Sequence, residues 1–285
     1  MALSSHQLDA FHMVAQELSF SRAAERLHVT QSALSQRVIN LEEELGITLF
    51  IRDRAKLQLT EEAFKLLRYC QTKNTLENET LAQINSSNRQ RKVIRVGGFS
   101  SITRSLLIPA LANLVHGDPT LKLNIMAREL RDLPEMLRSS ELDYIVVDSK
   151  IDREDLSHVL LGYEENVLVK SKKYAPREVY LDHDEDDETT LRYLKLLGKK
   201  SLNLNRMYLD EVYGLLDGVK KGLGYSVLPK HLIRDHKDLN IVNPHTVLKI
   251  PIYLHFYAQS YYPRIHQSVI DALEKYSKKI FGFDT

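Results

Sequence analysis

The sequence has little of three features that mark particular classes of protein: cysteine, charge of one sign, and long apolar runs. A single cysteine, Cys70, excludes an internal disulfide and a four-thiolate metal site, as expected for a reducing compartment. The net charge is only +1, which favours neither a protein that coats polyanions nor one that lies on a membrane surface. No stretch approaches the roughly 18 consecutive apolar residues of a membrane span, and the N-terminus lacks a signal-peptide pattern. We therefore expect a cytoplasmic protein without membrane attachment.

The first 60 residues are predicted to form a small helical domain with a β-hairpin. The chain has 285 residues, enough for two or three domains. Apolar residues recur at helical spacing over 5–46, which predicts three short helices, the last two separated only by the turn 28–30. Ser21 and Thr30 are predicted to cap the second and third helices, and Gly46 to end the third. Two β-compatible runs then flank a basic turn and predict a hairpin, or wing.

A long helix is predicted to follow, beginning after the cap Thr60 and ending near residue 87, because this stretch contains neither glycine nor proline. Its apolar positions form a stripe: Ala63, Leu66, Leu67, Cys70, Leu76, Leu81 and Ile84. A small domain cannot bury such a stripe alone, so we expect the helix to pair with a second copy. Cys70 is interpreted as a buried inert thiol on this stripe rather than a redox switch.

Beyond residue 92 strands and helices alternate. Strands are expected near 93–98, 121–127 and 142–149, with helices between them, a βαβαβ pattern that predicts a parallel sheet. A second unit follows, with strands at 166–171, 201–205 and 225–229, and the chain ends in a strand and a helix. The acidic run 182–188 matches no metal-binding loop, and a solvated surface loop is the better interpretation.

The predicted third helix carries an asymmetric polar face. Leu34, Val38 and Leu41 share one side, so Ser32 and Gln36 point the opposite way, flanked by Ser35, Arg37 and Asn40. Short hydrogen-bonding side chains without a carboxylate suit the DNA major groove, where Gln and Asn can read adenine and Arg can read guanine. Three glutamates, 42–44, stand at the far end, away from a docked phosphate backbone. The alternative is an ordinary solvated face of an amphipathic helix.

Residues 8–63 resemble the helix-turn-helix segment of LysR-type transcriptional regulators. The resemblance includes Ser-Phe-x-Arg-Ala-Ala, Thr-Gln-Ser-Ala-Leu-Ser, Leu-Glu-x-x-Leu-Gly and Leu-Phe-x-Arg. It implies that the major groove is contacted by Thr30, Gln31, Ser32, Ser35, Gln36 and Arg37, and that Arg52 and Arg54 of the wing lie near phosphate or the minor groove. The family most often has Pro at Ser32 and Arg at Gln36. The run Ser-Gln-Arg at 35–37 is instead similar to the branch that includes the lysine- and arginine-responsive regulators.

The rest of the chain resembles the effector-binding domain of this family, in which two periplasmic-binding-protein-like lobes close over a small molecule. The resemblance is carried by the segments 93–114, 139–147 and 219–229. The loop Gly-Gly-Phe-Ser-Ser between a strand and a helix suits an anionic ligand. The candidate ligand contacts are Ser100, Ser101, Thr103, Arg128, Asn203 and Asn205.

Each of these candidates has a simpler interpretation. Ser100 and Ser101 can be simple helix caps that bind no ligand. Arg128 can form a surface ion pair with Glu129 or Asp132. Gly222 and Gly224 are interpreted as a helix stop and a tight strand entry rather than a binding loop.

The predicted architecture is α/β with an all-α-plus-wing N-terminal domain. It comprises a winged helix-turn-helix at 1–60, a linker helix and hinge at 61–92, and an effector domain at 93–285. In the effector domain, lobe I is 93–163 with 251–285 and lobe II is 164–250. The predicted function is a dimeric or tetrameric regulator that binds double-stranded promoter DNA, responds to an amino acid or carboxylate, and acts with RNA polymerase, without cofactor or metal. The alternatives are a solute-binding protein of the same two-lobed fold, an effector-independent regulator, and an enzyme whose site no motif reveals.

Overall fold

A computed structural model of the chain describes residues 3–53, 56–84, 92–199 and 204–282. The chain divides into two compact units. The first comprises residues 1–90 with two short segments, 138–140 and 260–263, and the second comprises the remaining residues. Each unit is described by itself below.

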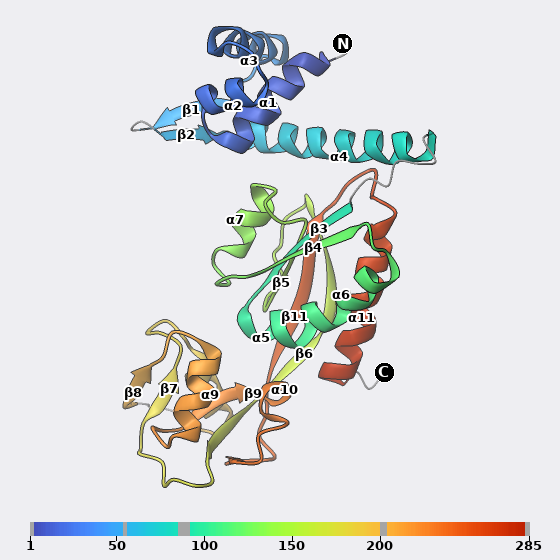
Figure 1. Ribbon diagram of the computed structural model, residues 1–285. Helices are drawn as coiled ribbons and strands as arrows, with labels where there is room; N and C mark the ends of the chain where they lie inside the picture. The colour runs from blue at the N-terminus through green and yellow to red at the C-terminus, as the bar shows by residue number, and fades with distance from the viewer. Residues whose placement is uncertain (1–2, 54–55, 85–91, 200–203, 283–285) are drawn as a thin grey trace. The chain divides into compact units, whose positions relative to one another are not determined.

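The first unit holds three short helices, a two-stranded wing and a long helix (Figure 1). Their bounds are α1 Ser5–Glu17, α2 Phe20–Arg26, α3 Gln31–Leu45, β1 Phe50–Asp53, β2 Lys56–Leu59 and α4 Glu61–Ile84. The predicted caps of α3 and α4 are confirmed, since the Oγ1 atoms of Thr30 and Thr60 accept hydrogen bonds from the N–H groups of Ala33 and Ala63. Gly46 ends α3 at φ +66°.

The predicted cap of α2 is wrong. Ser21 lies inside the helix, and the cap is Ser19, whose side chain accepts from the N–H of Arg22 at 3.4 Å. Ser19 has the extended backbone, φ −160° and ψ 119°, that a cap residue adopts just before a helix begins.

Phe50 joins the two halves of the core of the first unit. Its ring lies 5.5 Å from that of Phe11 and 5.7 Å from that of Phe20, centroid to centroid. It packs both against the cluster that includes Leu41 and against the cluster that includes Leu34. The wing and the helices therefore form one packed body, which fixes the orientation of α3.

The second unit is built on a seven-stranded sheet in the order β10-β6-β11-β5-β3-β4, with β9 also paired to β6. The bounds are β3 Lys92–Gly98, β4 Leu121–Ala127, β5 Tyr144–Val147, β6 Leu156–Ser171, β9 Ser226–Pro229, β10 Leu239–Ile241 and β11 Leu248–Tyr257. The parallel sheet predicted from the βαβαβ pattern is confirmed, since β3 pairs in parallel with β4 and with β5. The long strands β6 and β11 pair antiparallel, and β11 is antiparallel to β5.

The strand predicted at 166–171 is the second half of β6. The pairing with β11 shifts register between Ile252 and Tyr253, opposite Gly162, which has φ +146°. The irregularity at this glycine lies within one 16-residue strand, of which only the second part was predicted. Because β6 and β11 continue through this point, they connect the two halves of the second unit.

Helices pack against the part of the sheet formed by β3, β4 and β5 and against the neighbouring part of β6. They are α5 Ser100–Ile102, the π-helix η1 Thr103–Leu107, α6 Ile108–Gly117, α7 Leu133–Arg138 and α11 Ile265–Phe281. The helix predicted between the first two strands is therefore interrupted by one π-helical segment. A side chain at Gly97 would place its Cβ 2.4 Å from Leu142 Cδ1, so glycine permits this close packing on β3.

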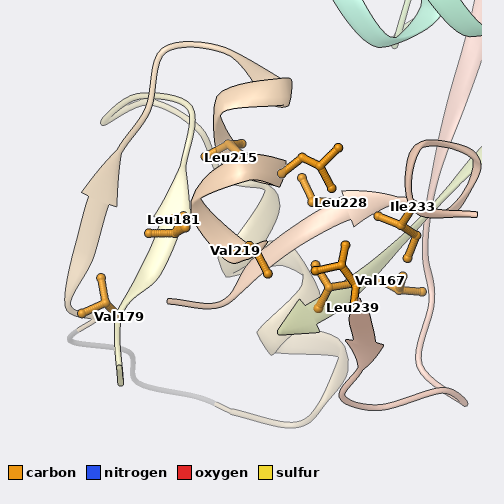
Figure 2. Packing of buried hydrophobic residues seen from close by; sticks show 10 residues of the cluster. Val167, Val179, Leu181, Leu215, Val219, Leu228, Ile233 and Leu239 are labelled. Atoms are coloured by element: carbon orange, nitrogen blue, oxygen red, sulfur yellow. The ribbon is translucent and has the colours of Figure 1, made fainter. Parts of the chain in front are cut away.

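The other half of the second unit has its own small sheet and core. It holds β7 Tyr180–Asp182, β8 Arg206–Tyr208, α8 Thr189–Leu196, α9 Val212–Lys220 and α10 Lys230–Ile233. Figure 2 shows its core, contributed by strands and helices together: Val167, Val169, Val179, Leu181, Leu215, Leu216, Val219, Leu228, Ile233 and Leu239. Of the strand predicted at 201–205, residues 201–203 lie outside the described residues, and β8 begins only at Arg206.

Gly222 and Gly224 permit backbone conformations and contacts that a side chain would hinder, as predicted. Gly222 follows α9 at φ +76°, and a Cβ at Gly224 would lie 2.4 Å from the carbonyl oxygen of Val179. The first is a helix stop, and the second is a close approach of two backbone segments.

Candidate DNA-binding face and effector site

The exposed side of α3 is formed by the short polar residues that the sequence singled out. Ser32, Gln36 and Asn40 are all exposed and follow one another at intervals of four residues, so they lie along one face. The Nε2 atom of Gln36 donates a hydrogen bond to Oδ1 of Asn40 at 2.8 Å. Both amides retain further donors and acceptors for a base edge.

Ser35 and Arg37 occupy the flanks of this face. Both are half-buried, whereas Gln36 between them is exposed. At about 100° per residue, Arg37 is turned toward the side of buried Leu41 and Leu34. Arg37 therefore lies at the edge of the helix face rather than at its centre.

The amino end of α3 is linked to α2 through side chains. The hydroxyl of Ser21 donates to Oε1 of Gln31 at 3.0 Å, and the hydroxyls of Thr30 and Ser32 lie 3.2 Å apart. Thr30, Gln31 and Ser32 are all exposed. Ser21, which is not a cap, instead holds Gln31 in place on this polar surface.

The glutamates at the far end of α3 have different roles. The Oε1 atom of Glu42 accepts hydrogen bonds from the N–H groups of Leu49 at 2.6 Å and Phe50 at 3.2 Å. Glu43 is exposed on the same side as Gln36 and Asn40, one turn further along. Glu42 thus anchors the start of the wing, a role that the charge pattern alone did not reveal.

The wing is an antiparallel hairpin. Phe50 pairs with Leu59 and Asp53 with Lys56, and Arg52 lies opposite Leu57 in β1. The side chain of Arg52 and the whole of Arg54 lie outside the described residues.

Of the predicted effector contacts at the end of β3, Thr103 has a structural hydrogen bond, and Ser100 and Ser101 do not act as the helix cap. Ser100 is half-buried and Ser101 is 2% exposed in the first turn after the strand. The residue at the cap position is Phe99, without a side-chain cap hydrogen bond, so neither serine is the cap. Thr103 is buried, and its hydroxyl donates to the carbonyl oxygen of Gly98 at 3.1 Å, which is a structural role.

Arg128 lies at the same sheet edge as the two serines. Gly98 is paired with Ala127 across the parallel strands β3 and β4, and the N–H of Arg128 donates to the carbonyl oxygen of Gly98 at 3.1 Å. The side chain is exposed, and its Nη1 atom donates to the carbonyl oxygen of Ala127. The structure therefore brings Arg128, Ser100 and Ser101 together.

Asn205 is placed elsewhere. The next residue after β7, His183, lies 3.8 Å from Glu129, which follows Arg128, so this end of β7 faces the sheet edge. Asn205 precedes β8, and its carbonyl oxygen accepts a hydrogen bond from the N–H of Tyr180 at the start of β7. Tyr180 is about 10 Å along the strand from His183. The prediction that Asn205 closes over a ligand at this edge is not supported by its position, and Asn203 lies outside the described residues.

Several groups that bridge the two halves of the second unit were missed by sequence reasoning. The guanidinium of Arg104 in η1 lies 3.8 Å from the ring centroid of Tyr213 in α9. His231 of α10 lies within hydrogen-bond distance of both Ser105 in η1, at 3.1 Å, and Glu164 in β6, at 2.8 Å. These partners are more than 60 residues apart in sequence, and no local spacing could have revealed them.

Two carboxyl groups in this region carry shifted pKa values. Burial raises the pKa of Asp148, which follows β5 at the same sheet edge. Burial also raises the pKa of Asp182, against the opposing effect of hydrogen bonds from Thr190 and Arg206.

The acidic run 182–188 is organised around one cation. The Nε atom of Arg206 lies 2.5 Å from Oδ2 of the buried Asp182, and its terminal nitrogens donate to three backbone carbonyl oxygens of the run. The prediction of a solvated loop therefore missed the contacts of Arg206 that hold this run in a fixed conformation. Within the described residues no group of three metal-ligating side chains is found.

Two family models match the chain and together cover most of it. Residues 5–63 match the bacterial regulatory helix-turn-helix protein of the lysR family, and residues 87–278 match the LysR substrate binding domain. The chain belongs to the LysR family. It is a LysR-type DNA-binding transcriptional regulator with an effector-binding domain, as the resemblances of residues 8–63 and of the rest of the chain implied.

The relatives of this LysR-family chain are regulators as well. It is 30% identical over 161 residues to the HTH-type transcriptional regulator HdfR of Yersinia enterocolitica, covering 56% of this chain and 55% of that protein. It is 25% identical over 261 residues to a probable RuBisCO transcriptional regulator of Synechocystis, covering 83% of this chain and 74% of that one. The match to HdfR thus spans only about half of either protein.

Solved LysR-family structures share the fold over nearly the whole chain. ArgP from Mycobacterium tuberculosis has a TM-score of 0.83 at 21% identity, covering 98% of this chain and 99% of that one. Full-length LysG from Corynebacterium glutamicum with bound effector Arg has a TM-score of 0.77 at 19% identity, covering 96% and 97%. At these identities the comparison establishes the fold. No helix in the described part of the chain is long and apolar enough to span a membrane.

Proposed function

We propose that this LysR-family regulator binds promoter DNA with the exposed face of α3 in the major groove. The observation that carries the proposal is the exposed row Ser32, Gln36 and Asn40, along which no carboxylate occurs before Glu43. Gln36 and Asn40 supply amides that can pair with adenine. Arg37, at the flank, is proposed to contact the edge of the groove or the phosphate backbone, beside Thr30, Gln31 and Ser35. Arg52 and Arg54 of the wing remain proposed phosphate or minor-groove contacts.

The proposed DNA-binding form is a dimer or a tetramer. The helix α4 exposes Tyr69, Leu76 and Leu81, each between 45% and 49%, although its first half also carries the buried residues Leu67 and Cys70. Pairing this part of α4 with a second copy would remove these side chains from water and separate two recognition helices. The proposed organisation keeps 1–60 as the DNA-binding domain, 61–92 as linker and hinge, and 93–285 as the effector domain.

The proposed effector is a small molecule with a carboxylate, bound where Ser100, Ser101 and Arg128 meet. An arginine at the carboxyl end of parallel strands, beside two serines, suits a carboxylate. The arginine bound to LysG supports an amino acid as the first ligand to test. We propose no cofactor or metal and no catalytic activity, with RNA polymerase as a partner at the promoter and the cytoplasm as the site of action.

The DNA-binding proposal is tested by fluorescence anisotropy of the full chain with labelled duplexes from the region upstream of its own gene. Gln36→Ala is expected to weaken specific binding by about 1–3 kcal/mol, the value of one bidentate base contact. Gln16→Ala is a matched control, because Gln16 is an exposed glutamine on α1. Equal losses in both variants, or none in either, would refute the assignment of the α3 face.

The effector proposal is tested by thermal unfolding of the full chain with a panel of amino acids and small carboxylates. A ligand at 100 times its Kd is expected to stabilise the protein by about 2.7 kcal/mol. Arg128→Gln should abolish the stabilisation and Arg131→Gln, an exposed neighbour, should retain it. Absence of any shift across the panel would favour an effector-independent regulator.

A further inference from the structure

A cavity lies in the second unit, apart from the residues proposed to bind the effector. It has a volume of about 520 Å³ and is formed by α10, the strand β10, Glu165 of β6 and the last turn of α11. Neither the serines at 100 and 101 nor Arg128 line it. Its volume lies in the range of small-molecule sites, roughly 300–1,000 Å³.

The walls of this cavity carry an excess of positive charge. Three cations, Lys230, Arg234 and Lys279, line it together with one carboxylate, Glu165. Glu165 is already paired, with Lys230 at 2.7 Å and with Lys249 at 3.7 Å. The hydrogen bond from Lys230 lowers the pKa of Glu165, so this carboxyl group stays an anion.

Arg234 and Lys279 are the two cations of the cavity without a carboxylate partner among the described residues, and Nζ of Lys279 lies 5.4 Å from the ring centroid of Tyr276. Both are exposed, and in the described part of the chain neither forms an ion pair. The carboxyl end of α11 also points carbonyl groups here, but a helix end carries only about half a charge. The three cations therefore exceed the combined negative charge of the carboxylate and the helix end.

The floor of the cavity is apolar. Ile233 and Leu239, which Figure 2 shows in the core of this half, also line the cavity, and Ile241, Ile280 and Phe281 complete the apolar surface. Ile241 is 37% exposed. A ligand with an apolar body would cover this surface, and a bare inorganic ion would not.

His231 connects this cavity to the contact between the two halves of the unit. It lines the cavity, its ring packs edge-on against that of Phe281 at 6.1 Å, and it bonds with Ser105 and Glu164. A ligand seated against His231 therefore touches a residue that holds η1 to α10.

We propose that this cavity is a second ligand site, for an organic anion that joins a carboxylate to an apolar ring or chain. Arg234 and Lys279 bind the carboxylate, and Ile233, Leu239 and Ile241 contact the apolar body. The site goes beyond the proposed effector function, because it uses no residue of the sheet edge at Arg128. A ligand bound there bridges α10 and α11.

The probe for the test is 4-fluorobenzoate, followed by ¹⁹F NMR in a titration of the full chain. Saturable binding to one site per chain is expected. Arg234→Gln and Lys279→Gln should each weaken it about tenfold, the value of one charged hydrogen bond. Lys278→Gln is the matched control for the second variant, since Lys278 is exposed, adjacent to Lys279 and outside the cavity.

A second pair of variants tests the apolar floor. Ile241→Glu places a carboxylate in the cavity and should abolish binding, whereas Asn240→Glu, the exposed neighbour on the opposite face of β10, should leave it unchanged. Inorganic phosphate should compete at least tenfold more weakly than unlabelled benzoate.

Three outcomes would overturn the proposal: no saturable binding, equal affinity in Arg234→Gln, Ile241→Glu and the native chain, or competition by phosphate as strong as by benzoate. Loss of binding in Arg128→Gln alone would place the probe at the sheet edge and would also contradict it. None of these outcomes bears on DNA binding by α3.

Discussion

The Nε2 atom of His231 lies 2.8 Å from the Oε1 atom of Glu164, and both side chains are only 6% exposed. One tautomer satisfies both ring nitrogens, with Nε2–H donating to Glu164 and Nδ1 accepting from the hydroxyl of Ser105. The amide of Asn166 also donates to Glu164, at 3.4 Å. This buried chain of polar groups connects η1, β6 and α10, and its energetic importance can be measured.

Glu164→Ala should destabilise the effector unit by about 3 kcal/mol, because it leaves buried donors without an acceptor. Urea unfolding of the full chain measures the loss. Glu165→Ala is the control, since Glu165 is about one-third exposed and its ion pairs contribute at most about 1 kcal/mol. Equal effects of the two variants would show that the buried chain contributes little.

Glu42→Ala should loosen the wing, because the carboxylate accepts from the N–H groups of Leu49 and Phe50. We expect a loss of about 1–3 kcal/mol in the free energy of unfolding of the first unit, from thermal unfolding. Glu43→Ala, the exposed neighbour, should cost less than about 0.5 kcal/mol. A neutral Glu42→Ala would mean that the wing does not depend on this contact.

Gly224→Ala should destabilise the protein by about 1–3 kcal/mol, because its Cβ would lie 2.4 Å from a backbone oxygen that cannot move independently. Gly117→Ala serves for comparison, since a Cβ there meets nothing within 4 Å. The midpoints of urea unfolding of the two variants measure this difference in stability. If Gly224→Ala is as stable as Gly117→Ala, the close approach to Val179 is relaxed in solution.

Cys70 should react slowly with iodoacetamide in the folded chain. It is 3% exposed, and burial raises the pKa of its thiol from 9.0 to about 11. The folded state then binds the thiol proton more tightly than the unfolded state, so this group contributes stability that is full below pH 9 and is lost as pH rises through about 11.

The single cysteine makes the measurement direct, with mass spectrometry of the alkylated chain at pH 8 and the urea-unfolded protein as reference. Modification of the folded chain at the unfolded rate would contradict the buried position of Cys70 on α4.

The local features of the first unit could be predicted from the sequence because they depend on neighbouring residues. Thr30 and Thr60 cap the helices that begin directly after them, and Gly46 ends the helix directly before it. The cap of α2 was misassigned because two serines, Ser19 and Ser21, stand two residues apart and only the backbone decides between them. The role of Glu42 could not be predicted, because it depends on how the start of the wing packs against the end of α3.

In the second unit the sequence predicted the strands of the βαβαβ half and missed the antiparallel crossing. Only residues 166–171 of β6 were predicted as a strand, and nothing local marks the pairing of β6 with β11. The same holds for the candidate site. Ser100 and Arg128 lie at the same edge of the sheet because β3 and β4 are parallel neighbours, whereas Asn205 lies beside the start of β7, which the sequence does not reveal.

The measurement that tests the central claim most directly is hydroxyl-radical footprinting of the full chain on the DNA upstream of its own gene. Two recognition helices of a dimer should protect two half-sites on one face of the duplex, about 34 Å or a multiple apart. The protection should weaken at both half-sites in Gln36→Ala and persist in Gln16→Ala. Protection without a helical-turn spacing, or full protection by Gln36→Ala, would contradict the account of α3 as the helix that reads DNA.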